Sequence, residues 1–313
     1  MRVSVVICTW NRCELLRDTL ETVRSLIVPA DQEWELLVVD NHSSDATEEV
    51  IASYREVLPL RHLFEPELGL SRARNTAVRA AAGDLILFTD DDVRIDPGWM
   101  KAYLEAARRW PGAGYFGGEI RPIFAAGVPP WVRRYQSALA GMLCLRDMGP
   151  VERRLRRGEY PYGPNMAVRR DALALASFDE RVGRTGHQQV RGCEGSLLLS
   201  LQRQGVWGVW TPGAKIGHYI PPCRANAKYL WSYYYGSGRC QVRLGIICGV
   251  QSRSRLLSAG LRELAKSCRW PWAWPRHLAT VAWMSGQLFE LRELARRRNV
   301  VEADAVECNR EYS

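Results

Sequence analysis

Residues 69–93, GLSRARNTAVRAAAGDLILFTDDDV, contain a helix pattern, a strand pattern and three consecutive aspartates, in that order. Ser71 to Ala82 has helical spacing, and Leu85 to Phe88 is an uninterrupted apolar run with the length of a short strand. The same alternation continues on both sides, with apolar runs at 3–8 and 36–39 and helix patterns at 13–26, 46–57 and 98–109. Strands that are apolar throughout, with helices between them, indicate a parallel sheet covered on both faces. The sequence therefore predicts an α/β, doubly wound domain.

The carboxyl ends of the predicted strands carry the candidate site, because ligands bind open parallel sheets at that edge. The rule selects Thr9 to Arg12, Asp40 to Asp45, and Asp90 to Asp92. Three adjacent carboxylates at a buried strand end need a cation, and Mg²⁺ or Mn²⁺ bound to carboxylates and substrate phosphates would supply it. Alternatively the trio is an exposed acidic turn, and Asp45 serves equally well as a helix N-cap.

A cationic helix start precedes the third strand. Arg72, Arg74 and Asn75 lie at the beginning of the helix pattern, where a helix N-terminus with adjacent arginines suits a diphosphate. The alternative, a solvated basic face, is equally compatible with the pattern.

Three segments together resemble the nucleotide-binding half of a family 2 glycosyltransferase with the GT-A fold: VSVVICTWNR at 3–12, VVDNHSSDAT at 38–47, and residues 69–93. The resemblance implies a nucleotide diphospho-sugar donor and a divalent cation, Mn²⁺ or Mg²⁺. Asp92 would bind the metal directly, and Asp90 or Asp91 would reach the ribose. The implied donor-binding residues are Thr9, Asn11, Arg12, Asp40, Arg74, Asp90 and Asp91.

The second half resembles the same family at shorter segments. Residues 163–170, GPNMAVRR, resemble the segment that lines the acceptor side, which points to Asn165 and Met166. Residues 192–197, GCEGSL, resemble the segment that holds the catalytic base. The family has two adjacent acids there and this chain has one, so Glu194 is the predicted base. The alternative is a favourable first-turn charge on a helix.

His218, in KIGHYIPP at 215–222, resembles the histidine that completes the metal site in several family members. A neutral imidazole can join carboxylates around Mn²⁺. The alternative is a hydrogen-bonded structural histidine. Arg224 follows closely, and would either reach the diphosphate or pack against the C-terminal helices.

Composition limits the class and the compartment. The 313 residues are 47% hydrophobic and 25% charged, which excludes disorder and coiled coil for the whole chain. A net charge of +9 favours anionic partners. Nine cysteines without a C-x-x-C pair suggest neither a disulfide framework nor a zinc site. The chain start lacks a signal-peptide pattern, and no apolar run has the length of a membrane helix, so we expect a cytoplasmic protein.

The C-terminal part is chemically distinct. We expect a nucleotide-sugar half at 1–120, an acceptor and catalytic half of the same domain at 121–224, and a basic, Trp-rich helical extension at 225–313. Between Ser252 and Asn299 ten Lys or Arg residues stand against three Glu, with four tryptophans among them. This pattern suits helices on the anionic inner face of a membrane, or equally a packed core with solvated arginines. Single-stranded nucleic acid would also suit it, but the first half argues against nucleic acid.

The sequence therefore predicts a metal-dependent, inverting glycosyltransferase. It would move a sugar from a nucleotide diphosphate donor, with uridine favoured by the resemblance, to a hydroxyl of a saccharide or lipid-linked acceptor in cell-surface glycan synthesis. Two alternatives remain. A sugar nucleotidyltransferase would usually have a glycine-rich first loop, and Thr9 to Arg12 contains no glycine. A non-catalytic nucleotide-sugar-binding protein would result if Glu194 were the remnant of a lost base.

Overall fold

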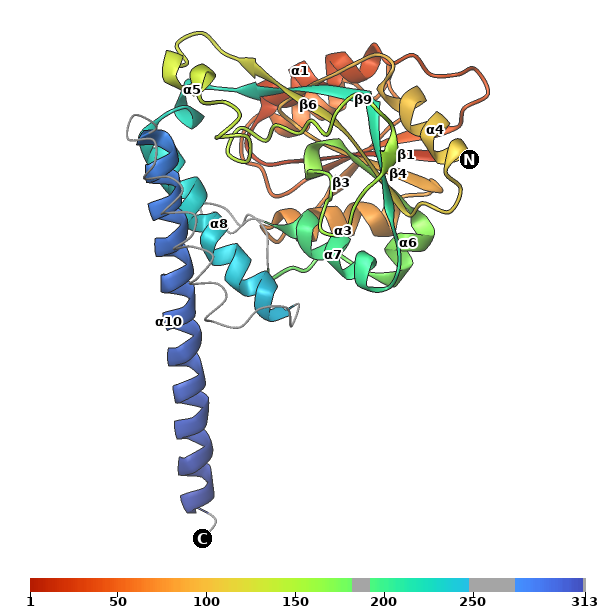
Figure 1. Cartoon of the computed structure of the whole chain (residues 1–313). Coiled ribbons are helices and arrows are strands. Elements are labelled where there is room, and N and C mark those ends of the chain that lie inside the picture. The colour runs from red at the N-terminus through yellow and green to blue at the C-terminus, as the bar shows by residue number, and fades with distance from the viewer. Residues whose placement is uncertain (182–191, 248–273, 312–313) are drawn as a thin grey trace. The chain divides into compact units, whose positions relative to one another are not determined.

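The computed structural model describes residues 1–181, 192–247 and 274–311 (Figure 1). Among these, residues 1–181 and 193–225 belong to one compact unit, and residues from Asn226 onward belong to a second. Each unit has its own packing.

The first unit is built on a mixed, mostly parallel sheet. Its parallel part has the order β3-β2-β1-β4 and consists of β1 (Val3–Thr9), β2 (Trp34–Asp40), β3 (Leu60–Phe64) and β4 (Leu85–Asp90). The sheet continues through β8 (Met166–Arg169), antiparallel to β4 and β6, then β6 (Tyr115–Phe124), β9 (Gly208–Ile220) and β5 (Val93–Ile95). The short β7 (Arg153–Arg154) pairs with β9.

Helices cover both faces of this sheet, which explains the continuous apolar strands. Successive side chains of a strand point to opposite faces, so Val3, Val5 and Ile7 of β1 join one core cluster and Val6 joins the other. The first cluster includes side chains of α1 (Cys13–Arg24), α2 (Thr47–Ser53) and α4 (Trp99–Arg109). The second includes side chains of α3 (Leu70–Ala80), α6 (Arg170–Leu175) and α7 (Cys193–Arg203).

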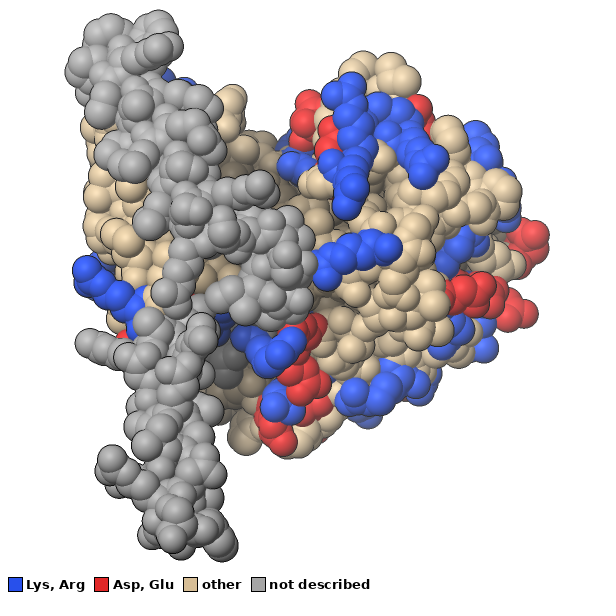
Figure 2. All heavy atoms as spheres, turned by 60° about the horizontal axis from the view of Figure 1, so that its bottom comes forward, with Lys and Arg blue, Asp and Glu red and all other residues tan. Residues whose placement is uncertain are grey.

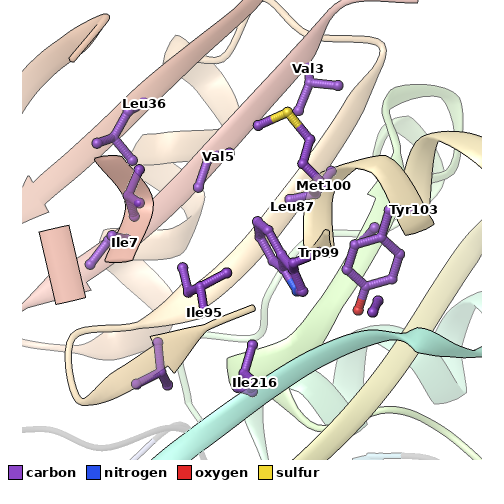
Figure 3. Close-up of a cluster of buried hydrophobic side chains, with 14 of the residues drawn as sticks. Val3, Val5, Ile7, Leu36, Leu87, Ile95, Trp99, Met100, Tyr103 and Ile216 are labelled. Carbon is purple, nitrogen blue, oxygen red and sulfur yellow. The ribbon is translucent and has the colours of Figure 1, made fainter. Parts of the chain in front are cut away.

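The α4 side chains fill the centre of the first cluster. Figure 3 shows Trp99, Met100 and Tyr103 packed beside Val3 and Leu87, and all five are fully buried. The α/β prediction for the first part of the chain is confirmed, including strands at the three apolar runs and helices at the periodic stretches. Within the described residues, β3 and the five strands after β4 were not among the predicted apolar runs. Residues 120–165 contain the end of β6, α5 (Pro130–Arg134), β7 and the short turn η1 (Gly163–Asn165).

Within its described residues, the second unit contains two helices that pack together, α8 (Ala227–Ile247) and α10 (Trp274–Glu311). Two glycines allow their backbones to approach: a Cβ on Gly238 would lie 2.0 Å from the Trp283 carbonyl oxygen, and one on Gly286 2.0 Å from that of Tyr235. The buried Glu290 accepts hydrogen bonds from Arg239 and Arg243 at 2.8 and 2.7 Å, which fixes the register of the pair.

Within the described residues, no helix is both long enough and apolar enough to cross a membrane. Trp270, Trp272 and the basic residues from Arg253 to Arg269 lie outside the described residues. On the face of the molecule that Figure 2 shows, Lys and Arg side chains are interspersed with Asp and Glu and with uncharged surface.

Candidate active site

The predicted donor-side residues that follow the strands lie at one edge of the sheet, where β1, β2 and β4 end. Thr9 is in register with Asp40 on one side, and Cys8 is in register with Asp90 on the other. Parallel pairing brings the ends of these strands together, and the structure confirms that Thr9, Asp40 and the three aspartates share this edge.

The three consecutive aspartates have different surroundings. The side chain of Asp90 is 29% exposed and lies 3.4 Å from Arg74. Asp91 is buried and accepts hydrogen bonds from Thr9 Oγ1 at 2.8 Å and from Arg12 at 2.9 Å. Burial raises the pKa of Asp91, although Arg12 opposes the shift. Both carboxylate oxygens of Asp91 are therefore engaged inside the protein, and Asp90 is the more accessible candidate for the donor.

Asp92 is buried among positive neighbours. Its Oδ2 atom lies 2.9 Å from Arg224 and 3.2 Å from Arg12, and its Oδ1 atom lies 3.4 Å from His218 Nε2. Burial alone would raise the pKa of Asp92, but His218, Arg224 and Arg12 hold it well below the ordinary value of 3.8. The carboxylate is therefore ionised throughout the neutral range.

The loop after β2 folds over the end of β1 through side-chain hydrogen bonds. Asn11, at a φ of 51°, accepts a hydrogen bond from the Ser44 backbone at 2.7 Å. Asp40 accepts one from the Ser43 backbone at 2.9 Å. Asp45 accepts one from the backbone of Cys13, the first residue of α1, at 3.0 Å, although the N-cap residues of α1 and α2 are Arg12 and Ala46. Asn11 and Asp40 thus shape the loop, and their contact with a donor stays a prediction.

Arg74 connects the donor edge to α7. This buried guanidinium reaches Asp90 from Nη2, while its Nη1 lies 2.8 Å from Cys193 Sγ and 3.6 Å from Glu194 Oε2. Cys193 in turn donates to Glu194 Oε2 at 3.1 Å. Burial raises the pKa of Cys193 even though Arg74 opposes the shift, so the group remains a thiol that can donate. Gly163 leaves room for the guanidinium, since a Cβ there would lie 2.4 Å from Arg74 Nη2.

The expected acceptor-side residues lie elsewhere. Asn165 and Met166 are fully buried, and Met166 belongs to the second core cluster. Asn165 donates to the carbonyls of Glu119 and Ala214 at 2.8 and 2.9 Å and accepts from two α4 side chains at 2.7 Å. Its amide is therefore engaged inside the core. The prediction that these two side chains contact the acceptor disagrees with the structure, because both lie inside the protein.

His218 and Asp92 suit a divalent cation. The His218 Nδ1 atom lies 2.9 Å from the Leu143 carbonyl oxygen, so this nitrogen donates a hydrogen bond and Nε2 is the ring nitrogen that could bind a metal. Asp92 Oδ1, 3.4 Å away, is buried without a hydrogen-bond partner. A carboxylate oxygen and an imidazole nitrogen that face each other in a buried site fit a metal ligand set completed by phosphate oxygens. Within the described residues, no group of three or more His, Cys, Asp or Glu side chains could hold a metal ion.

Two residues of this edge were not among the predicted site residues. Cys193 stands next to Glu194 in the sequence, and its contact with Arg74 spans 119 positions. Arg224 was expected at the diphosphate or against the C-terminal helices, and it contacts Asp92. Arg224 follows His218 by six residues, just beyond the end of β9, and this proximity in the sequence could have indicated that it belongs to the site.

Comparison with known proteins explains this arrangement. Residues 4–173 match the model of glycosyl transferase family 2. The chain belongs to this family. The match covers the donor edge and ends before α7 and β9, so it does not reach Glu194 or His218.

Curated proteins with related sequences match most of this chain. It is 26% identical over 252 residues to the succinoglycan biosynthesis protein ExoM of Rhizobium meliloti, covering 78% of this chain and 75% of that protein. It is 24% identical over 233 residues to a glucosyl-dolichyl phosphate glucuronosyltransferase of Haloferax volcanii, covering 74% and 73%.

Solved structures of similar fold confirm the GT-A-like architecture. The mannosyltransferase PcManGT from Pyrobaculum calidifontis, in complex with GDP-Man and Mn²⁺, superposes with a TM-score of 0.62 at 16% identity, covering 93% of this chain and 87% of that one. Glucosyl-3-phosphoglycerate synthase from Mycobacterium tuberculosis, in complex with Mn²⁺, UDP and phosphoglyceric acid, has a TM-score of 0.52 at 18% identity, covering 80% of each chain. Structural relatives thus bind Mn²⁺ together with a nucleotide or a nucleotide sugar.

Proposed function

We propose that this family 2 glycosyltransferase transfers a sugar, with inversion, from a nucleotide diphosphate donor to a hydroxyl of a saccharide or lipid-linked acceptor in cell-surface polysaccharide synthesis. A uridine diphosphate sugar is the favoured donor. Relatives named for succinoglycan biosynthesis and for a dolichyl phosphate sugar support the acceptor class. The observation that carries the mechanism is the continuous contact from Asp90 through Arg74 to Glu194.

The residues connected by Arg74 have separate roles on the donor side and on the acceptor side. Asp90 would bind the donor at the end of β4, and Asp92 and His218 would hold a divalent cation. This cation would supply positive charge to the diphosphate and to the leaving nucleotide. Arg74 balances the negative charge of both Asp90 and Glu194 and fixes their separation, since it is itself buried.

Glu194 acts as the general base. Its side chain is 23% exposed, which leaves it accessible to an acceptor. The carboxylate removes the proton from the acceptor hydroxyl while that oxygen attacks the anomeric carbon from the face opposite the nucleotide. The bond to the donor phosphate breaks in the same displacement, and the configuration inverts. Cys193 orients the base because it donates to Glu194 Oε2 while it accepts from Arg74.

Replacement of the base tests this proposal. A positioned base contributes about 10²–10⁴ in rate, so Glu194→Gln should lower kcat by about that factor and leave donor affinity unchanged, as measured by calorimetry. Glu48→Gln is the matched control, because Glu48 is an exposed first-turn acid of α2. It tests the alternative that Glu194 is only a favourable helix charge. Equal turnover of the Glu194→Gln variant and the Glu48→Gln control would place the base elsewhere.

Contact with an anionic membrane stays a prediction. In the second unit Trp231 and Trp274 are 39% and 43% exposed, and Phe289 is 40% exposed. Such aromatic side chains suit a membrane interface.

A further inference from the structure

The Arg224 side chain contacts both candidate metal ligands, Asp92 and His218. Arg224 follows β9 in the short turn η2 (Pro222–Arg224), and its side chain is only 12% exposed. One terminal nitrogen lies 2.9 Å from Asp92 Oδ2, and the other lies 3.4 Å from His218 Nε2. A single guanidinium therefore contacts the carboxylate and the imidazole nitrogen that the proposed cation would use.

The charge balance of Asp92 is complete within the protein. Arg12 places a second guanidinium 3.2 Å from the same oxygen that Arg224 contacts. A buried carboxylate needs such compensation, so a metal ion is not required to keep Asp92 ionised in the folded chain. The other oxygen of Asp92, 3.4 Å from His218, is the buried atom without a hydrogen-bond partner.

We propose that Arg224 is a counter-ion that competes with the divalent cation for Asp92 and His218. This inference rests on the proposed function of the same site. A free cation that approaches these ligands meets the positive charge of Arg224 and must displace its hydrogen bonds. A donor diphosphate offers the guanidinium another anionic partner and so releases the ligands. Metal and donor therefore bind with positive coupling, and the coupling is reciprocal.

Binding of Mn²⁺ alone to the full chain is the decisive measurement, with free Mn²⁺ followed by electron paramagnetic resonance. Loss of a charge-assisted hydrogen bond to a buried group corresponds to about 10- to 100-fold in an equilibrium constant. Arg224→Gln should therefore bind Mn²⁺ about 10- to 100-fold more tightly than the wild type in the absence of nucleotide. Arg224→Lys keeps the positive charge and should stay near the wild type. Arg109→Gln is the matched control, because it removes one positive charge from a partly exposed pair with Glu152.

The coupling supplies a second readout. Saturating UDP should increase Mn²⁺ affinity strongly in the wild type and by at least tenfold less in Arg224→Gln, since the competitor is already absent. Circular dichroism confirms that each variant is folded. An Mn²⁺ affinity of Arg224→Gln within threefold of the wild type would overturn the inference, as would an Arg224→Lys variant that binds as tightly as Arg224→Gln. Absence of Mn²⁺ binding in every variant, with and without UDP, would instead refute the metal site of the proposed function.

Discussion

Replacement of Asn165 by leucine separates a structural role from an acceptor contact. Asn165 lies in η1, beneath the point where the register between β6 and β9 shifts next to Gly118 and Glu119. A β-bulge of this kind interrupts the ladder of hydrogen bonds. The Asn165 amide donates to the carbonyls of Glu119 on β6 and of Ala214 on β9, next to the shift. It therefore supplies donors where the sheet lacks them.

The expected loss of stability follows from the groups left behind. Asn165→Leu keeps the volume but leaves two backbone carbonyls, Trp99 Nε1 and the Tyr103 hydroxyl without this partner. Each buried unsatisfied group costs about 1–3 kcal/mol. Even if partial relaxation rescues some of them, we expect a loss of about 4 kcal/mol or more in the free energy of unfolding. This is a large share of the roughly 5–15 kcal/mol of a typical protein.

Asn165→Asp is a second variant of nearly the same shape. It keeps an oxygen for the two α4 donors but turns a second oxygen toward the two carbonyls, so a buried carboxylate must stay charged without a cation or take up a proton, and we expect a loss at least as large as that of Asn165→Leu. Asn75→Leu is the matched control, because Asn75 is only half-buried and its bonds to the backbone of Phe178 can be replaced by water.

Urea unfolding followed by far-ultraviolet circular dichroism gives the stabilities, and steady-state kinetics give the acceptor KM. The structural role predicts that Asn165→Leu lowers the unfolding free energy far more than Asn75→Leu does. If Asn165→Leu instead unfolds within about 1 kcal/mol of the wild type and raises only the acceptor KM, the residue contacts acceptor and this reasoning is wrong.

Three further substitutions test other contacts of the structure. Asp92→Ala should remove the Mn²⁺-dependent part of donor affinity in calorimetry, and an unchanged affinity in the presence of Mn²⁺ would refute its role as a ligand. Gly163→Ala places a Cβ 2.4 Å from Arg74, and since displaced catalytic groups lose about 10²-fold in rate, kcat should fall about 10- to 100-fold. Gly213→Ala, whose Cβ would meet its nearest neighbour at 3.4 Å, is the control. Burial tends to raise the pKa of Glu290, but its two arginine partners lower it below 4.5 in the folded chain. The unfolded chain therefore binds the proton first, so this stabilisation is present above about pH 4.5 and is lost as pH falls through the lowered folded value. Thermal unfolding of Glu290→Gln should lack that acid-dependent loss.

The sequence determined the central part of the sheet and the donor edge. Strands covered on both faces must be apolar at every position, which makes β1, β2 and β4 visible as short continuous runs. Parallel pairing then places the polar residues after these strands at one edge, so the neighbourhood of Thr9, Asp40 and the three aspartates follows from local patterns alone.

Local patterns failed where burial is one-sided or interrupted. β3 lies at the edge of the sheet and has half-exposed side chains with Arg61 and His62 among them. β9 contains Pro212, Lys215 and three glycines at positions 208, 213 and 217. Neither strand has a continuous apolar run, because neither is buried evenly along its length.

Only the tertiary structure decided which side chains serve the site. Asn165 looked like an acceptor contact by its sequence context, yet folding places it in the core, where buried carbonyls and donors engage its amide. The contacts of Arg74 with Cys193, and of Asp92 with Arg224, join residues more than a hundred positions apart. The spacing of apolar residues along the chain predicts which face of a helix or strand is buried. It does not predict which charged residue from a distant part of the sequence will contact that helix or strand in the folded protein.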